Sequence, residues 1–175
     1  MYNYFKKSKI IFLLILAFTL NNNCGFSPIY ADKSDVPEVK IALKKIYVAP
    51  IEDEGETGLR KQLYLALGKQ GEDGAKFQLI ISLDETLYSV ILKSDGTVDR
   101  YDYSIQVNYD LIDSNTNSII DSNMVKSISA YNVETSDFET AQAKKTAIQL
   151  TSNEIVNSIK RQLSVSLYSY LLTSN

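Results

Sequence analysis

Eleven consecutive residues that alternate between apolar and polar side chains constrain the fold of this chain most strongly. The apolar members are Tyr101, Tyr103, Ile105, Val107, Tyr109 and Leu111. The polar members between them are Asp102, Ser104, Gln106, Asn108 and Asp110. Because successive side chains of a strand point to opposite faces, this pattern predicts a strand with one buried face and one solvated face. We expect the tyrosines to belong to the core of a sheet rather than to a sugar or lipid site.

Two further segments predict strands on either side of this one along the chain. Residues 77–92 begin with alternating Phe77, Leu79, Ile81 and Leu83, and their apolar character continues to Leu92, whereas residues 119–131 have a less regular pattern. Turn-forming residues at 93–97 and 113–117 separate the three segments. Together they predict an antiparallel meander.

The remaining periodic segments predict one more strand and two helices. Residues 39–51 contain β-branched positions and end near Pro50, which is typical of a strand. Apolar residues at helical spacing predict a short helix over 59–67, ended by Gly68, and a long one from Asp137 to Leu163 or beyond. Ser136 and Glu139 form a capping-box pattern at its start. The order β-α-β-β-β-α predicts an α+β fold, a two-layer sandwich whose four-stranded, mostly antiparallel sheet carries two helices on one face.

The composition excludes most catalytic and metal chemistry. The chain has 175 residues, no His and one Cys, so it lacks the usual general base, intrachain disulfides and thiolate zinc clusters. Eighteen basic residues against 21 acidic ones give a net charge of −3, which argues against a nucleic-acid partner. We therefore expect no enzyme, no metal and no cofactor.

The first 23 residues predict a signal peptide. Lys6, Lys7 and Lys9 precede an apolar segment, Ile10 to Leu20, which as a helix spans only about 16 Å. That length is too short for a bilayer core of about 30 Å but fits the basic and apolar regions of a secretory signal. The only cysteine, Cys24, follows, where a bacterial lipoprotein is cleaved and acylated. An uncleaved membrane anchor or an ordinary buried cysteine are the alternatives.

Residues 24–37 hold two of the three prolines and read as a lipidated N-terminus and tether, so the folded domain is expected over 38–175. Without the three lysines of the leader, the remaining chain has 15 basic and 21 acidic residues and a net charge of −6. Its few cations therefore draw attention as contacts for an anionic partner. The candidates are Lys93, Arg100, Lys144 and Lys145, and the alternative is ordinary solvated charge.

Several short motifs resemble one family. Cys24-Gly25-Phe26-Ser27-Pro28-Ile29-Tyr30 is similar to the lipidated start of the LPS-assembly lipoprotein LptE family, alphaproteobacterial type. Val48-Ala49-Pro50-Ile51 before Leu59-Arg60-Lys61-Gln62-Leu63 resembles its first strand and helix, and Ser136-Asp137-Phe138 with Ala141 the entry to its last helix. The residues before Cys24 depart from the family pattern, because Asn23 stands where a small residue is usual.

The resemblance implies a non-catalytic lipoprotein of the outer membrane that faces the periplasm. It implies a function in plugging and assembling the β-barrel LptD and in lipopolysaccharide transport and insertion at the cell surface. Lys93 best matches the family's basic hairpin position for lipopolysaccharide, with Arg100, Lys144 and Lys145 as further candidates. The alternative is a periplasm-facing lipoprotein that acts as a ligand-binding or transport-complex accessory domain without a barrel partner.

Overall fold

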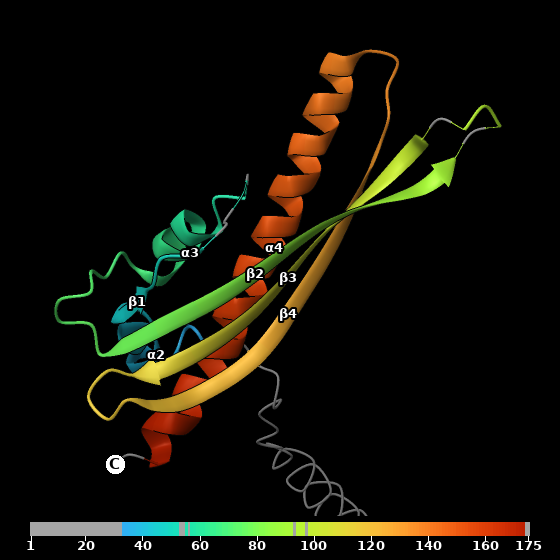
Figure 1. Cartoon of the computed structure of the whole chain (residues 1–175). Coiled ribbons are helices and arrows are strands. Elements are labelled where there is room, and N and C mark those ends of the chain that lie inside the picture. The colour runs from blue at the N-terminus through green and yellow to red at the C-terminus, as the bar shows by residue number, and fades with distance from the viewer. Residues whose placement is uncertain (1–32, 53–54, 56, 93, 97, 174–175) are drawn as a thin grey trace, which may run out of the picture. The chain divides into compact units, whose positions relative to one another are not determined.

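A four-stranded sheet forms one layer of the domain (Figure 1). The computed structural model describes residues 33–52, 55, 57–92, 94–96 and 98–173. Strands β2 (Phe77–Leu92), β3 (Val98–Asp113) and β4 (Ser118–Asn132) form the antiparallel meander that the sequence predicts. The short strand β1 (Ile46–Val48) pairs in parallel with β2, so the order is β1-β2-β3-β4. The sheet is mixed but mostly antiparallel, as expected.

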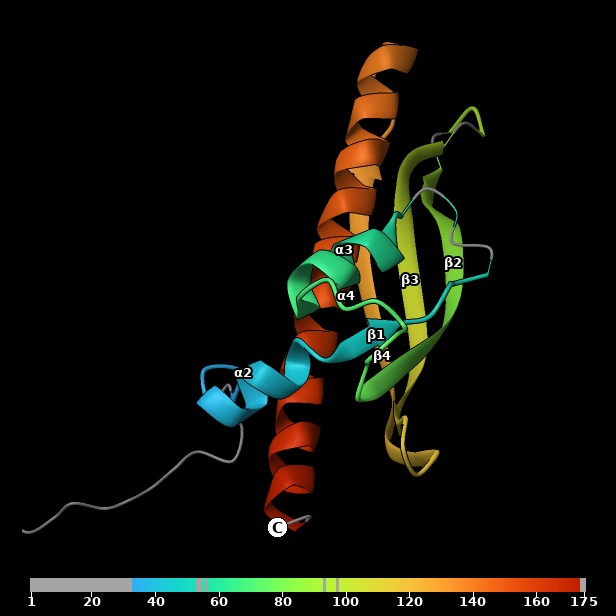
Figure 2. The same ribbon diagram turned by 90° about the vertical axis from the view of Figure 1, so that its left-hand side faces the viewer.

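Three helices form the second layer, and all lie on the same side of the sheet (Figure 2). They are α2 (Pro37–Leu43), α3 (Leu59–Leu67) and α4 (Asp137–Thr173). The predicted helices over 59–67 and from Asp137 are confirmed, and α4 continues for ten residues past Leu163. The prediction of two helices was one helix short.

The prediction of a strand from residue 39 was wrong for its first half. Residues Pro37–Leu43 form α2, and only Ile46–Val48 pair with β2. Val39, Ala42 and Leu43 are buried at helical spacing against α4, whereas the β-branched Ile41 is exposed. Pro37 suits the first position of a helix, because the lost N–H has no helical partner there. Burial of one helical face therefore outweighs β-propensity.

The core lies between the layers and is built from alternate residues of the strands and one face of each helix. Of the alternating series in β3, Tyr103, Ile105, Val107, Tyr109 and Leu111 are buried. Tyr101 is half-buried and stacks on Tyr131, with ring centroids 5.5 Å apart. The tyrosines of β3 therefore contribute to the core and its margin, as predicted.

Local capping fixes the ends of the helices close to their predicted positions. The backbone N–H of Glu139 donates to Ser136 Oγ at 3.2 Å, which is the expected first half of the capping box. Gly68 ends α3 with a φ of +125°, a conformation open to glycine. An added Cβ there would also lie 3.1 Å from the Cα of Lys44. Glycine is therefore required at this helix end for two reasons.

Candidate functional site

A hollow of about 190 Å³ lies between the sheet and the first turns of α4. It is lined by Glu85, Thr86, Leu87, Tyr103 and Lys144. The Tyr103 hydroxyl donates to Glu85 Oε2 at 2.5 Å, whereas Glu85 Oε1 is buried without a hydrogen-bond partner among the described residues. Lys144 is therefore placed beside a buried carboxylate on the helix side of the sheet.

Gly55, from the acidic segment after β1, packs on this cluster. Its φ is +62°, and an added Cβ would lie 2.6 Å from Glu85 Oε1. The backbone conformation favours glycine here, and a larger residue would also displace the end of the Glu85 side chain. Gly55 therefore lies against β2 at Glu85.

The structure does not bring Arg100 together with Lys144. Arg100 is exposed on β3 and pairs with Asp102 on the same face of the strand, with Nε and Oδ1 3.5 Å apart. Asp102 alternates with the buried Tyr103, so Arg100 lies on the face away from the helices, opposite Lys144. Lys145 is exposed on α4. These three predicted anion contacts therefore do not form one cationic patch.

Lys93 and Cys24 lie outside the described residues. Lys93 falls in the connection between β2 and β3, which places it next in sequence to the end of β2. The assignment of Lys93, Arg100, Lys144 and Lys145 to lipopolysaccharide, and of Cys24 to lipidation, stays a prediction.

The distal end of β2 carries an apolar cluster that sequence reasoning missed. Four large side chains there are between 45% and 50% exposed, namely Leu87, Tyr88, Val90 and Ile91. Because Leu87 and Tyr88 are consecutive in the strand, they point to opposite faces of the sheet, and Leu87 lines the hollow beside α4. In sequence, these residues end two positions before Lys93.

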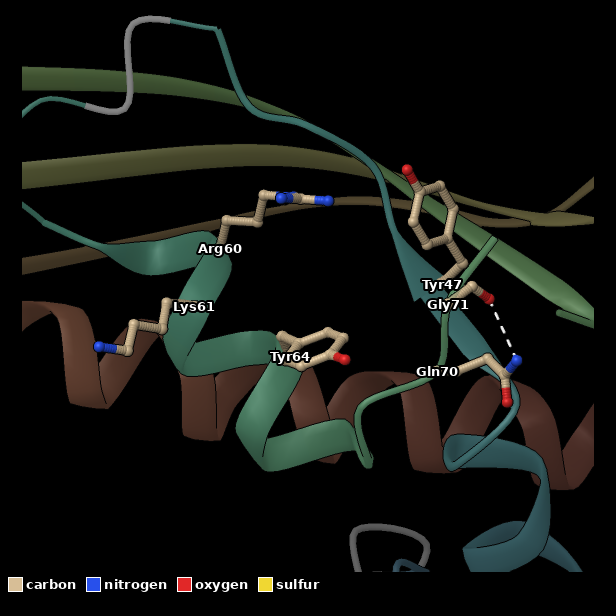
Figure 3. A pocket seen from close by; sticks show the side chains of 6 residues that line it. All are labelled: Tyr47, Arg60, Lys61, Tyr64, Gln70 and Gly71. Atoms are coloured by element: carbon tan, nitrogen blue, oxygen red, sulfur yellow. Dashed lines mark hydrogen bonds between the residues drawn. The ribbon is translucent and has the colours of Figure 1, made fainter. Parts of the chain in front are cut away.

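A second hollow, of about 420 Å³, lies beside β1 (Figure 3). It is lined by Tyr47, Arg60, Lys61, Tyr64, Gln70 and Gly71. Arg60 reaches across to β1, and its guanidinium donates to the carbonyls of Val48 and Ala49 at 3.2 to 3.3 Å. Because Gln70 also bridges to Tyr47, this end of the sheet is closed by its own chain. The residues around this hollow serve the packing of β1 rather than forming a catalytic set.

Hydroxyl and carboxylate groups between α4 and the sheet hold the two layers together. The Tyr109 hydroxyl lies 2.8 Å from Gln162 Oε1 and 3.1 Å from Asp121 Oδ2. Burial, with the nearby Asp121 carboxylate, raises the pKa of Tyr109 far above its ordinary value. Tyr109 therefore stays protonated at neutral pH and acts as a hydrogen-bonding core residue.

Two further features concern metal binding and membrane crossing. Within those ranges, no group of three or more Cys, Asp or Glu residues is placed to hold a metal ion. No helix of the described chain is long and apolar enough to cross a membrane.

Several solved structures of bacterial lipoproteins are similar to this fold. A candidate lipoprotein from Caulobacter crescentus CB15 matches with a TM-score of 0.62 at 20% identity, covering 75% of this chain and 96% of its own. Lipoprotein B from Nitrosomonas europaea matches with a TM-score of 0.56 at 14% identity, covering 73% and 86%. At such identities, these likenesses show a shared fold.

The family comparison covers most of the folded domain. No curated protein matches the sequence. A family model described as LptE, lipopolysaccharide-assembly, matches residues 43–163, which is well over half of the chain. That range runs from the end of α2 into α4 and includes the whole sheet. The chain belongs to the LptE lipopolysaccharide-assembly family.

Proposed function

We propose that this protein is an outer-membrane lipoprotein that plugs and assembles an LptD-like β-barrel. In that position it assists lipopolysaccharide transport and insertion at the cell surface. The observation that carries the proposal is the family match over residues 43–163, which coincides with the two-layer domain. The role is non-catalytic, because the domain supplies a folded body and contacts rather than reacting groups.

The dimensions of the domain support a plug. Strands β2 and β3 have 16 residues each and, at about 3.3 Å per residue, extend roughly 50 Å. Helix α4 has 37 residues and, at about 1.5 Å per residue, extends roughly 56 Å. The outward apolar band of a membrane barrel is only about 25 Å tall. A body of this length can therefore extend through a barrel lumen.

The proposed anchor is a lipid attached to Cys24 after removal of residues 1–23. Each buried CH₂ of an acyl chain contributes about 0.8 kcal/mol, and two or more chains are needed for a stable anchor. Holding the domain at the membrane raises its effective concentration near a membrane-embedded partner. The anchor therefore serves assembly rather than chemistry.

Replacing the acylation site tests the anchor. Cys24→Ala should abolish palmitate labelling and remove the protein from the outer-membrane fractions of a density gradient. Cys24 is the only cysteine, so no second thiol can take the lipid. Labelling of the variant at the wild-type level would contradict lipidation at this residue.

The proposed lipopolysaccharide contacts are Lys93, Arg100, Lys144 and Lys145. Arg100 and Lys145 are exposed, and Lys93 stands two positions after Ile91, the last exposed apolar residue of β2, in sequence. A cation beside apolar side chains suits an amphiphile that has phosphate groups and acyl chains.

A thermal-shift measurement with purified lipopolysaccharide tests direct contact. The wild-type protein should gain thermal stability on addition of the lipid, because a ligand that binds only the folded state stabilises it. The gain should shrink in Lys93→Ala and persist in the control Lys40→Ala, which removes an exposed lysine on α2. An unchanged melting temperature of the wild type would rule out direct contact and leave only the role as a structural plug.

A further inference from the structure

One face of the sheet has no covering layer among the described elements. All three helices lie on the opposite side (Figure 2). Alternate residues of β2, β3 and β4 point away from the helices, since their neighbours in sequence form the core. We call these residues the open face: Ile80, Ser82, Asp84, Gln106, Asn108, Asp110, Ser122, Met124, Lys126 and Ile128.

The open face carries more exposed apolar surface than a solvated sheet face needs. Ile80 is 42% exposed, Met124 52% and Ile128 53%. Ile80 and Met124 line the same shallow hollow of about 370 Å³, together with the polar side chains of Ser82, Asn108 and Ser122. Exposed apolar side chains rimmed by polar groups are typical of a protein–protein contact.

The charges of the open face are few and of both signs. In the strand register Asp84 pairs with Gln106, and Gln106 pairs with Lys126. Asp110 is the third charged residue of the face and lies opposite Ser122. Farther along β3 on the same side, Arg100 and Asp102 form an ion pair with each other. An anionic lipid surface would require a cationic cluster, which this face lacks. Uncharged amide and hydroxyl groups suit a polar protein surface instead.

The exposed side of α4 has a different character. Its exposed large apolar side chains are 12, 15 and 7 residues apart, which places them roughly 18, 22 and 10 Å apart along the helix; they are Phe138, Leu150, Val165 and Leu172. An ion pair between Arg161 and Glu154 lies between Leu150 and Val165 in sequence. The exposed apolar residues of α4 are therefore scattered, whereas Ile80 and Met124 of the open face line one hollow.

We infer that the open face is the surface that contacts the inner wall of the barrel partner. This inference rests on the proposed function. The inside of a membrane barrel is lined by the polar side chains of tilted strands, so its chemistry matches the Ser, Asn and Gln side chains of the open face. Ile80 and Met124 supply apolar anchors within that polar contact, and the helix layer faces away from this part of the wall.

Arginine scanning of matched positions tests the inference in the full-length, tagged lipoprotein extracted in mild detergent. Asn108→Arg and Met124→Arg place a large charge on the open face. Asn157→Arg and Leu150→Arg make the same replacements on exposed positions of α4. The ratio of co-purified barrel to lipoprotein should fall about tenfold or more for the first pair of variants, which corresponds to an affinity weakened by about a factor of ten or more. It should stay at the wild-type value for the second pair.

Further measurements keep the result interpretable. If either open-face variant fails to reach the wild-type melting temperature, Ser122→Arg is measured in its place, because Ser122 is exposed on the edge strand β4. Retention of the barrel by folded open-face variants, or its loss only in the α4 variants, would overturn the inference while leaving the proposed function intact. A third outcome concerns self-association. If the wild type self-associates, and the open-face variants disrupt that form while barrel recovery is unchanged, the face contacts a second copy of the chain and the inference is also overturned. A wild-type protein that recovers no barrel would remove the proposed function itself.

Discussion

At the scale of single residues, buried acids and hydroxyls stabilise the domain instead of performing chemistry. Asp113 accepts hydrogen bonds from the Tyr170 hydroxyl at 2.7 Å and from the backbone N–H groups of Asn115 and Thr116. Asp121 accepts from Ser166 at 2.7 Å. Each carboxylate belongs to a strand end and each hydroxyl to the last turns of α4. These bonds therefore fix the C-terminal part of α4 on the sheet.

Asp113 should make stability dependent on pH in a defined direction. Burial opposes its ionisation, but the hydrogen bonds from Tyr170 and from the backbone outweigh that effect and lower the pKa of the carboxyl. Because the pKa is lowered in the folded state, ionised Asp113 stabilises the fold when the pH is above the ordinary carboxyl pKa near 3.9. This contribution is lost as the pH falls through the folded-state pKa. Tyr170→Phe should therefore reduce the free energy of unfolding more at pH 7 than at pH 2.5, in urea titrations.

The control for this experiment is Tyr88→Phe, since Tyr88 is half exposed on β2. That change should alter the free energy of unfolding by less than about 0.5 kcal/mol at either pH. An equal effect of Tyr170→Phe at both pH values would show that the hydroxyl does not favour the charged form of Asp113.

At the scale of elements, α4 contacts nearly every other part of the domain. It packs against β3 and β4 on one side and against α2 and α3 as well. Its buried face includes the small residues Thr151, Ser152 and Ser164, whose hydroxyls donate to carbonyls four residues earlier at 2.7 to 2.8 Å. Their polar atoms are thereby satisfied, and their size allows neighbouring elements to approach closely.

Truncation of the buried face of α4 should destabilise the whole domain. Ile155 is fully buried, so Ile155→Ala should cost about 2–5 kcal/mol through lost burial and the cavity that remains. Leu150→Ala, on the exposed side of the same helix, should cost about 0.5 kcal/mol or less. Chemical unfolding of both variants measures the difference, and similar values for the two would contradict the packing described here.

Sequence periodicity predicted the elements whose burial follows a simple repeat. The alternation from 101 to 111 and the long helix from Asp137 were read correctly, because one face of each is buried along nearly its entire length. Residues 39–43 were misread, because α2 is short and its β-branched residues favour a strand, whereas its contact with α4 comes from distant sequence. Tertiary burial decided the conformation of that segment.

The candidate site was harder to predict from sequence than the fold. The position of Arg100 on the face away from the core could be predicted, because Arg100 is one residue from Tyr101 and three from Tyr103, and such residues of a strand point to opposite faces. The approach of Lys144 to Glu85 could not be predicted, since it depends on how α4 is rotated against the sheet. The contact of Gly55 with Glu85 also joins residues far apart in sequence and requires the folded domain.

At the scale of the whole domain, the asymmetry of the two layers is the central feature. The helices bury one face of the sheet, and the other face remains open with exposed apolar and neutral polar side chains. The family match covers the same layered body. A domain with an uncovered sheet face is suited to assembly with a larger partner, and the lipid proposed at Cys24 would hold it at the membrane.

Recovery of partners from intact membranes tests the central claim most directly. The tagged full-length protein is extracted from bacterial outer membranes in mild detergent, purified through its tag and analysed by mass spectrometry. The proposal predicts that an LptD-like β-barrel is recovered in near-stoichiometric amount. It also predicts that the purified lipoprotein begins at a lipidated Cys24. Quantitative recovery of the lipoprotein with no large β-barrel would contradict the account and favour an accessory domain that acts without a barrel.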